Sequence, residues 1–494
     1  MAIYGGAPTV GYQTSERSGA TVQVYNRPGG VLQLASRVAG YDSRRIEDGD
    51  PQLLSVQCSN ALNSGGRFSF SLHVPPGVDV FSLIEIDAWC DISFYRFKTS
   101  WHIMRGMVDE VRVRRDVTGS GVTTITANVT GRSFQKAWET TPCWFNELSG
   151  NTFTDEIIFK ATGSGQIAST PPINIRSILF KFMDLVGTTG RANWQLPAAM
   201  PGPGGSVTTC VQYDTSLFDK TRLKRATIRG DLFFPDVKLW ALATQHYAES
   251  QFCELFTDIL PVGGTPALAQ HPKQESGISA SNSRMTLILR DKPFPLADPL
   301  TKGTLGLSGT YFKLPSWTVP PQAVRSIDLG KSSYEAFNSF MSVNNFDPES
   351  AASFGTLKAP LWSVNDMLRR GMRRLDTDSP YMAFAPTTDL ELMQARRARS
   401  RDWYCLGAEL GQGSVQFWRL HPEIHIGGRL RVAGATPDNN TTGYVESVRH
   451  QWSPQGGAVT AVDWTRVWQG TDRDLVARLG VVSRGYTLVP PSRA

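Results

Sequence analysis

The chain has 494 residues, of which 19% are charged and 40% are hydrophobic, and its formal net charge is +6. This length predicts about three domains, and the composition excludes a disordered chain. So small a charge on so long a chain does not by itself predict nucleic-acid binding. We expect no membrane-spanning helix, since no long apolar run occurs, and no signal peptide, since the first residues lack a charged start and an apolar core.

The cysteines do not form a metal-binding pattern. None of them forms a CxxC pair, and no histidines complete a zinc-finger grouping. Scattered single cysteines are typical of buried apolar residues in a reducing compartment, although disulfides stay open at this point. The six are Cys58, Cys90, Cys143, Cys210, Cys253 and Cys405.

Strand-like segments dominate the first third of the chain, after a small, polar stretch at residues 1–22 that we expect to be a flexible arm. The clearest segment is 67–74, where Phe68, Phe70 and Leu72 face one way and the intervening residues face the other. Such a density of strands without helices favours a small barrel or sandwich. Further strands are predicted at 31–40 and, as consecutive antiparallel neighbours, at 83–97, 101–117 and 122–134.

Helical spacing appears in the middle of the chain. Residues 173–187 carry apolar side chains at three- and four-residue intervals and end at a glycine, which predicts a helix. Residues 236–260 begin as an amphipathic helix and end as a strand, and residues 284–295 form a strand that prolines stop. A helix leading into a strand is predicted at 332–345. These elements indicate α+β insertions in a mainly β chain.

Residues 361–402 are the most basic segment. Arg369, Arg370, Arg373 and Arg374 would share one face of a helix. One interpretation is a surface for nucleic acid or an acidic partner, and the other is a solvated or subunit-facing side. The second is favoured because no aromatic residues alternate with the arginines, as stacking on bases would require. The interface candidates are Arg369, Arg370, Arg373, Arg374, Arg396 and Arg397.

The stretch RLHPEIHIGGRLRV at 419–432 holds two histidines around a glutamate. A zinc-protease helix needs H-E-x-x-H, but here Glu423 comes two residues after His421 and Pro422 interrupts the would-be helix. If the stretch is extended, Glu423 and His425 share one side. We therefore predict an entry to a late strand and no metal site. Further strands are expected up to about residue 470, with a short helix after them.

Other catalytic signatures are missing from the sequence. It contains no phosphate-binding G-x-x-x-x-G-K-[ST] loop and no G-x-S-x-G nucleophile elbow. The adjacent acidic residues Glu85/Asp87 and Asp109/Glu110 lie on predicted strands, and neighbouring positions in sequence do not establish the spatial pair that glycoside hydrolysis needs. We expect no catalytic residues, no metal and no cofactor.

The order of these segments resembles the tail hub (baseplate hub) proteins of tailed bacteriophages and related contractile injection systems. In that family a strand with a Gly-Arg pair closes the first barrel before a helix, here at 130–133. A proline- and glycine-containing entry to a late strand matches 422–430, and a Y-V-x-x-V-x-H strand matches 444–450. A glycine turn and a threonine-rich return strand ending in arginine match 456–466. The resemblance covers most of residues 25–470.

The resemblance implies a mainly β fold with α+β insertions, built on two tail-tube-like β-barrels that are partly discontinuous in sequence. It places the first barrel at 23–140 and strands of the second, with a loop and helix insertion, at 141–230. An α+β insertion follows at 231–410, late strands completing the second barrel lie at 411–470, and a C-terminal tail occupies 471–494.

The resemblance also implies a structural virion protein. Three copies would form a ring that adapts the sixfold tail tube to a threefold spike or central fibre, contact other baseplate proteins, and let DNA pass without binding it specifically. Such a protein would assemble in the host cytoplasm and lie at the distal end of the tail. The alternative is a cell-wall hydrolase or carbohydrate-binding tail component that uses carboxylates in the insertion at 146–230.

Overall fold

A computed structural model gives the fold, and its described part is mainly β, as predicted. The described residues are 18–26, 31–35, 52–62, 64–96, 99–117, 123–140, 253–261, 277–293, 310–332, 336–343, 361–378, 397–434 and 439–488, together with short pieces between 145 and 248 and residues 334 and 436.

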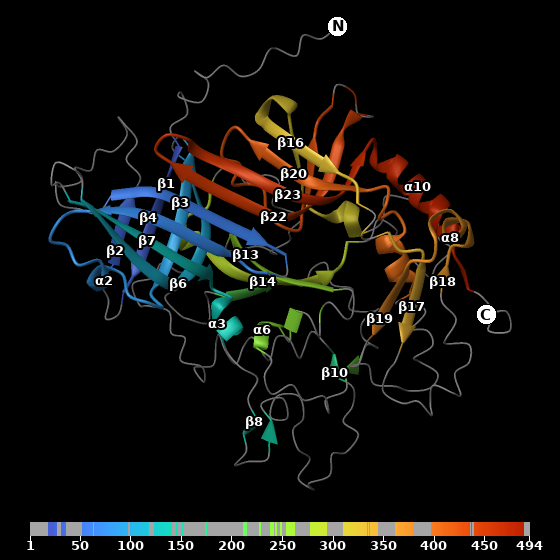
Figure 1. The fold of residues 1–494 in the computed structure, drawn as a ribbon, viewed down its shortest axis with the longest axis horizontal. Coiled ribbons are helices and arrows are strands. Elements are labelled where there is room, and N and C mark those ends of the chain that lie inside the picture. The colour runs from blue at the N-terminus through green and yellow to red at the C-terminus, as the bar shows by residue number, and fades with distance from the viewer. Residues whose placement is uncertain are drawn as a thin grey trace.

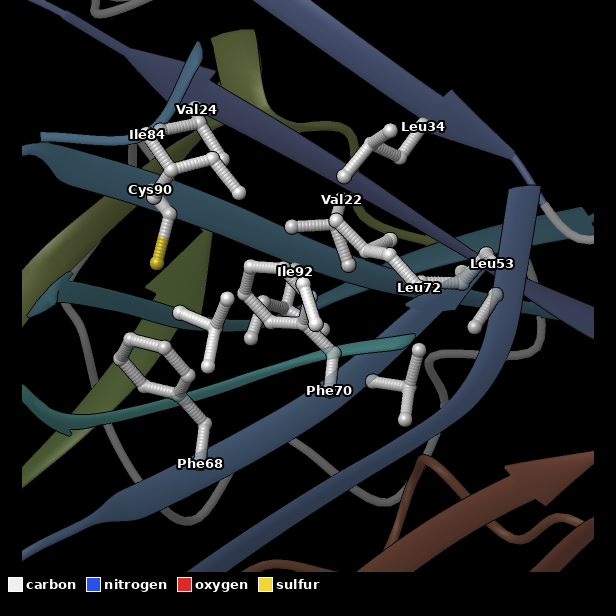
Figure 2. Packing of buried hydrophobic residues seen from close by; sticks show 14 of the residues in the cluster. Val22, Val24, Leu34, Leu53, Phe68, Phe70, Leu72, Ile84, Cys90 and Ile92 are labelled. Atoms are coloured by element: carbon white, nitrogen blue, oxygen red, sulfur yellow. The ribbon is translucent and has the colours of Figure 1, made fainter. Parts of the chain in front are cut away.

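The first hydrophobic core is enclosed by seven antiparallel strands in the order β3-β4-β7-β6-β5-β1-β2. Buried and partly exposed residues alternate along β4, as the sequence predicted, so that Phe68, Phe70 and Leu72 point into the core in Figure 2. Val22 on β1 and Ile92 on β5, which pair with each other, point into the same core. The strands are β1 (Ser18–Tyr25), β2 (Val31–Ala35), β3 (Gln52–Ala61), β4 (Arg67–Val74), β5 (Trp89–Arg96), β6 (Thr99–Val117) and β7 (Thr123–Ser133).

The predicted antiparallel run β5-β6-β7 is confirmed, but its first strand is shorter than expected. The chain forms the short helix α2 (Val80–Leu83) because the Asp79 carboxylate accepts a hydrogen bond from the amide of Phe81 and caps the helix. The strand begins only at Trp89.

Strands from later in the chain continue the sheet that encloses the first core, and they enclose a second hydrophobic core. Strand β22 pairs with β3, which places Trp452 opposite Val56 although almost the whole chain separates them. Figure 1 shows these late strands beside the N-terminal ones. The sheet carries on through β23 and β20 to β16, and β21 and β15 extend it from the other end of β22. The strands are β15 (Ser316–Val319), β16 (Val324–Gly330), β20 (Gly411–Phe417), β21 (Arg429–Val432), β22 (Thr441–Ser453) and β23 (Gly457–Gln469).

A small buried sheet, β11-β14-β13, packs into the second core and contacts β6 of the main sheet. All but the last residue of β13 are buried, as are all but one of β14, and the two pair in an antiparallel register. Phe256 and Ile288 from this sheet belong to the second core. The strands are β11 (Val211–Asp214), β13 (Cys253–Pro261) and β14 (Ser283–Asp291), and the last two confirm the strands predicted at 236–260 and 284–295.

A peripheral sheet with order β19-β17-β18-β24 packs beside the helices α8 and α10. Helix α10 confirms the helix predicted after the late strands. The elements are β17 (Ser339–Val343), β18 (Leu361–Trp362), α8 (Val364–Arg370), β19 (Arg374–Asp378), α10 (Asp472–Arg484) and β24 (Thr487–Leu488). Elsewhere lie α3 (Lys136–Thr140), α6 (Leu239–Ala241) and the two-stranded pairs β8 (Phe145–Asn146) with β9 (Asn151–Thr152) and β10 (Ile173–Asn174) with β12 (Thr227–Ile228).

Four predicted helices can be compared with the structure. The helix expected at 173–187 begins instead with strand residues at Ile173–Asn174, and the rest of that segment lies outside the described residues. The described residues just before β17 form no helix, contrary to the prediction for 332–345. The arginine-rich helix ends at Arg370, because Gly371 takes a positive φ of 75° that terminates it. The helical start predicted for 236–260 is confirmed by α6.

Candidate functional site

The most organised polar chemistry of the described residues lies at the junction, which we define as the buried polar network that joins β13 and β14 to strands β5, β6 and β22 and to the loop at 421–428. Some of its pairs lie within one sheet, and others link the small sheet to the main sheet or to the loop. Buried polar groups of this kind are costly to leave unpaired, so the junction holds the small sheet in one position.

One end of the junction is built around Asp91, on β5. Arg105 lies directly opposite on β6, and its Nε and Nη2 donate to the two Asp91 carboxylate oxygens at 2.6 and 2.9 Å. The His102 Nε2 lies 3.1 Å from the same carboxylate, and its Nδ1 lies 2.6 Å from the Ser283 hydroxyl of β14. Burial would raise the pKa of Asp91, but Arg105 and His102 hold that pKa well below its usual range. Asp91 is therefore an ionised anchor.

The other end of the junction is a buried triad of Glu254, Arg290 and Tyr444. The Arg290 Nη2 donates to Glu254 Oε2 at 3.0 Å and to the Tyr444 hydroxyl at 2.6 Å. The same hydroxyl donates to Glu254 Oε2 at 2.6 Å. Because Glu254 lies on β13, Arg290 on β14 and Tyr444 on β22, the triad ties the small sheet to the late strands. Burial raises the pKa of Tyr444 well above its ordinary value, so the hydroxyl keeps its proton.

Replacing Tyr444 with phenylalanine is expected to lower the free energy of unfolding by about 1–3 kcal/mol, because it leaves a buried arginine and glutamate short of a hydrogen bond. Urea unfolding of the purified protein measures this loss. The matched control is Tyr334→Phe, at a side chain that is 92% exposed. Equal stabilities of the two variants would contradict the structural role of the triad.

The histidine stretch at 419–432 is part of the same junction. His421 Nδ1 lies 2.8 Å from Glu423 Oε1, and His425 Nδ1 lies 2.8 Å from Asp258 Oδ2 on β13. Residues 421–428 contain two turns, and the strand begins at Arg429, so the predicted strand entry is confirmed.

A cavity of about 20 Å³ lies beside these histidines, lined by Cys58, Asp258, His425 and His450 among others. That volume is enough for about one water molecule and too small for a substrate. Within the described ranges, no three His, Cys, Asp or Glu side chains are grouped as metal ligands would be. The geometry of this site therefore fits a role in holding the two sheets together.

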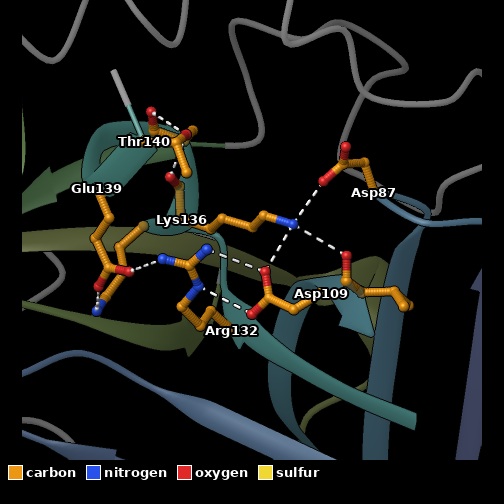
Figure 3. Close-up of polar contacts among 9 residues, drawn as sticks. Asp87, Asp109, Arg132, Lys136, Glu139 and Thr140 are labelled. Atoms are coloured by element: carbon orange, nitrogen blue, oxygen red, sulfur yellow. Dashed lines mark hydrogen bonds and ion pairs between the residues drawn. The ribbon is translucent and has the colours of Figure 1, made fainter. Parts of the chain in front are cut away.

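The Gly-Arg motif at 130–133 has a clear structural role. Figure 3 shows Arg132 between Asp109 and Glu139, with its Nε 2.9 Å from Asp109 Oδ2 and its Nη1 2.9 Å from Glu139 Oε2. Lys136 reaches Asp109 at 2.8 Å and Asp87 at 2.5 Å. The network fastens α3 to strands β6 and β7. Asp109 is thus a partner of two cations, which lower the pKa of its carboxyl against the effect of burial.

The predicted interface arginines are found in three settings. Arg369 and Arg370 occupy the last turn of α8, and Arg370 pairs with Asp366 at 3.1 Å. Arg373 follows the helix and Arg374 begins β19, so the four do not share a helical face, because Gly371 ends the helix between them. Arg397 is buried at 2% exposure, and burial lowers its pKa. Arg396 lies outside the described residues.

Reasoning from the sequence missed most of the junction residues. Four of them lie within strand segments that are otherwise apolar: Asp91, Arg105, Glu254 and Arg290. The one available signal was a charged residue inside an apolar run, because a buried charge needs a buried partner. None of the described helices is long and apolar enough to cross a membrane. Four described cysteines are free thiols, Cys58, Cys90, Cys253 and Cys405.

Comparison with solved structures returned phage tail proteins. The tail protein from Neisseria meningitidis MC58 matches with a TM-score of 0.48 and 10% identity, covering 91% of this chain and 96% of the other. The chain is similar to bacteriophage tail proteins. The prophage MuSo2 43 kDa tail protein from Shewanella oneidensis matches at 0.46 and 11% identity, covering 91% and 98%. The E. coli c3393 protein, a type VI secretion component, matches at 0.37 and 7% identity, covering 87% and 76%.

No protein-family model matches this sequence. A search of curated proteins likewise found no match.

Proposed function

We propose that this protein is a structural component of a phage tail, acting as a homotrimeric hub at its distal end. In this role it adapts the sixfold tail tube to a threefold spike or central fibre and forms part of the channel through which DNA passes. Its partners are further copies of itself, the tube protein, the spike or fibre, and other baseplate proteins. It assembles in the host cytoplasm before it joins the virion.

The observation that carries this proposal is the pairing of β22 with β3. Because of that pairing, a single sheet encloses two hydrophobic cores. The first core is formed by N-terminal strands and the second largely by strands near the C-terminus. Two strand-walled cores in one chain are what the hub resemblance implies, since three such chains supply six units to a sixfold tube. The predicted division into domains, with the first barrel at 23–140 and late strands at 411–470, is retained as part of the proposal.

The acidic pair Asp109/Glu110 does not favour a hydrolase, and the insertion at 146–230, whose carboxylates the alternative invokes, lies mostly outside the described residues. Asp109 is held by Arg132 and Lys136, and Glu110 pairs with Arg112 at 2.6 Å. Carboxylates that act as acid and base in glycoside hydrolysis flank the scissile bond, whereas these two are paired with neighbouring cations. The arginines Arg369, Arg370, Arg373 and Arg374 are proposed to contact protein, because phosphate contacts along a channel would hold the passing DNA.

The purified chain is expected to have the mass of a trimer in solution at micromolar concentration. Light scattering coupled to gel filtration measures the mass, and electron microscopy of the chain assembled with a tail tube shows whether three copies form a ring at the end of the tube. A monomer under all salt conditions, with no ring on the tube, would contradict the hub.

A further inference from the structure

Helix α8 exposes an apolar stripe that no described part of the chain covers. None of its seven residues is buried. Val364 and Leu368 are 50% and 83% exposed, and Met372, which lies just after the helix, is 55% exposed. Val364 and Leu368 lie four residues apart and share one face of the helix, while Met372 follows Gly371, which ends the helix. An isolated helix of this length is marginal in water, and a contiguous exposed apolar stripe is typical of a contact surface.

The stripe is surrounded by positive charge. Residues 364–374 contain four arginines and one aspartate, which leaves a net charge of +3. The ion pair between Arg370 and Asp366 lies within the segment and leaves this sum unchanged. We name this segment the α8 patch, residues 364–374. A partner that covers it would combine exposed apolar side chains with carboxylates.

A surface of that description exists on the same chain, around helix α2. Phe81 and Ile86 are 61% and 55% exposed, whereas their neighbours Val80 and Ile84 are buried. Residues 79–87 hold three carboxylates, Asp79, Glu85 and Asp87, and no cation. We name this segment the α2 patch, residues 79–87.

The network in Figure 3 leaves this region acidic. Lys136 pairs with Asp87, but it is shared with Asp109, and Arg132 is shared between Asp109 and Glu139. The three carboxylates of this network exceed its two cations by one. Asp79, whose side chain also caps α2, adds to that excess.

The two patches lie at opposite ends of the long axis of the molecule in Figure 1. They therefore cannot meet within one copy, and they are placed for a head-to-tail contact between copies. We propose that the α8 patch of one copy binds the α2 patch of the next, and that this contact closes the ring. The inference rests on the proposed homotrimer and names its interface. A heterologous contact of this kind forms a closed ring when the rotation between copies is suitable.

A second copy fits these observations better than a nucleic acid does. The α8 patch carries aliphatic side chains and methionine at its centre, where a nucleic-acid site carries aromatic side chains that stack on bases. Both complementary surfaces are present in equal number in every copy, so each subunit supplies what its neighbour needs. Since the attraction is partly between exposed charges, it weakens as salt screens them.

Leu368→Asp and Phe81→Asp each break one patch and leave the other intact. Each places a carboxylate where an exposed apolar side chain would be covered, so each variant alone is expected to run as a monomer at concentrations where the wild type is a trimer. The apparent dissociation constant should rise by more than tenfold, because the contact loses the burial of an apolar side chain and would have to bury a carboxylate in its place. Sedimentation velocity over a concentration series measures both.

Mixing the two variants is the decisive step. The intact α2 patch of the Leu368→Asp chain can bind the intact α8 patch of the Phe81→Asp chain, so a 1:1 dimer is expected, and it cannot grow because both its remaining ends are blocked. A mixture that stays monomeric, or a single variant that dimerises by itself, would overturn the head-to-tail contact. Val117→Asp is the matched control, because Val117 is 70% exposed and belongs to neither patch, and it should remain trimeric.

The outcomes separate this inference from the proposed function. A wild-type trimer that neither variant disrupts would overturn the interface and leave the hub in place. A wild-type monomer at all concentrations would overturn both. Thermal unfolding of each variant checks that the fold is retained, as expected for substitutions at exposed side chains.

Discussion

Replacing Arg105 with leucine is expected to lower the free energy of unfolding by about 3–5 kcal/mol, the cost of leaving one partner of a buried ion pair alone. Arg105 is fully buried and donates twice to Asp91, which is 2% exposed. Without the guanidinium, the Asp91 carboxylate must stay charged in a dry site or take up a proton. Either way, the link from β5 and β6 to Ser283 on β14 loses its anchor. Chemical denaturation at pH 7 measures the loss.

Arg112→Leu is the matched control on the same strand. Arg112 also pairs with a carboxylate at 2.6 Å, that of Glu110, but its side chain is 75% exposed. Exposed pairs contribute at most about 1 kcal/mol, so this variant should be close to wild type. A double variant, Asp91→Asn with Arg105→Leu, should regain part of the lost stability because no buried charge is then unpaired. Similar losses in the Arg105 and Arg112 variants would contradict the role of the junction.

Acidification from pH 7 to pH 4 is expected to cost on the order of 3 kcal/mol through His450 alone. Burial, and then the nearby His425, lowers the pKa of His450 from 6.5 to about 3. Because the folded-state pKa lies below the unfolded one, the unfolded chain takes up this proton first. Stability is therefore present above about pH 6.5 and is lost as pH falls toward about 3. His450→Gln removes this loss, and urea unfolding at pH 7 and pH 4 measures it.

His425 changes stability in the opposite direction. Burial would lower its pKa, but Asp258 raises it above the ordinary value. The stabilisation from this pair is fully present below about pH 6.5 and is lost as pH rises through the raised pKa. His425→Gln should therefore reduce stability most in acid, where His450→Gln helps. Parallel pH dependences of the two variants would contradict the assignment of these histidines.

Some features of the fold followed from local patterns. The alternation of Phe68, Phe70 and Leu72 predicted a half-buried strand, since side chains alternate between faces along any strand. Pro422 and the misplaced Glu423 argued correctly against a zinc helix at 419–432, because proline removes a helical donor. For the arginine-rich segment, the prediction from the local pattern was wrong. Its arginine spacing predicted a helical face, although the glycine that ends the helix was visible at 371.

The charged pairs of the junction could not be predicted from local sequence patterns. Asp91 faces Arg105 because β5 and β6 pair in one register, and a shift of one residue would separate them. The triad of Glu254, Arg290 and Tyr444 joins three strands whose separation in sequence reaches 190 residues. No local pattern encodes such a meeting.

The sequence by itself determined that this protein is mainly β, where most of its strands lie, and that its histidine motif begins a late strand, because period, proline and glycine act over a few residues. Only the tertiary structure decided that β22 lies beside β3, that a buried polar network joins the small sheet to the main sheet, and that α2 and α8 expose apolar side chains at opposite ends of the molecule. The physical reason is that strand pairing and burial depend on contacts between distant segments, which form only when the whole chain folds.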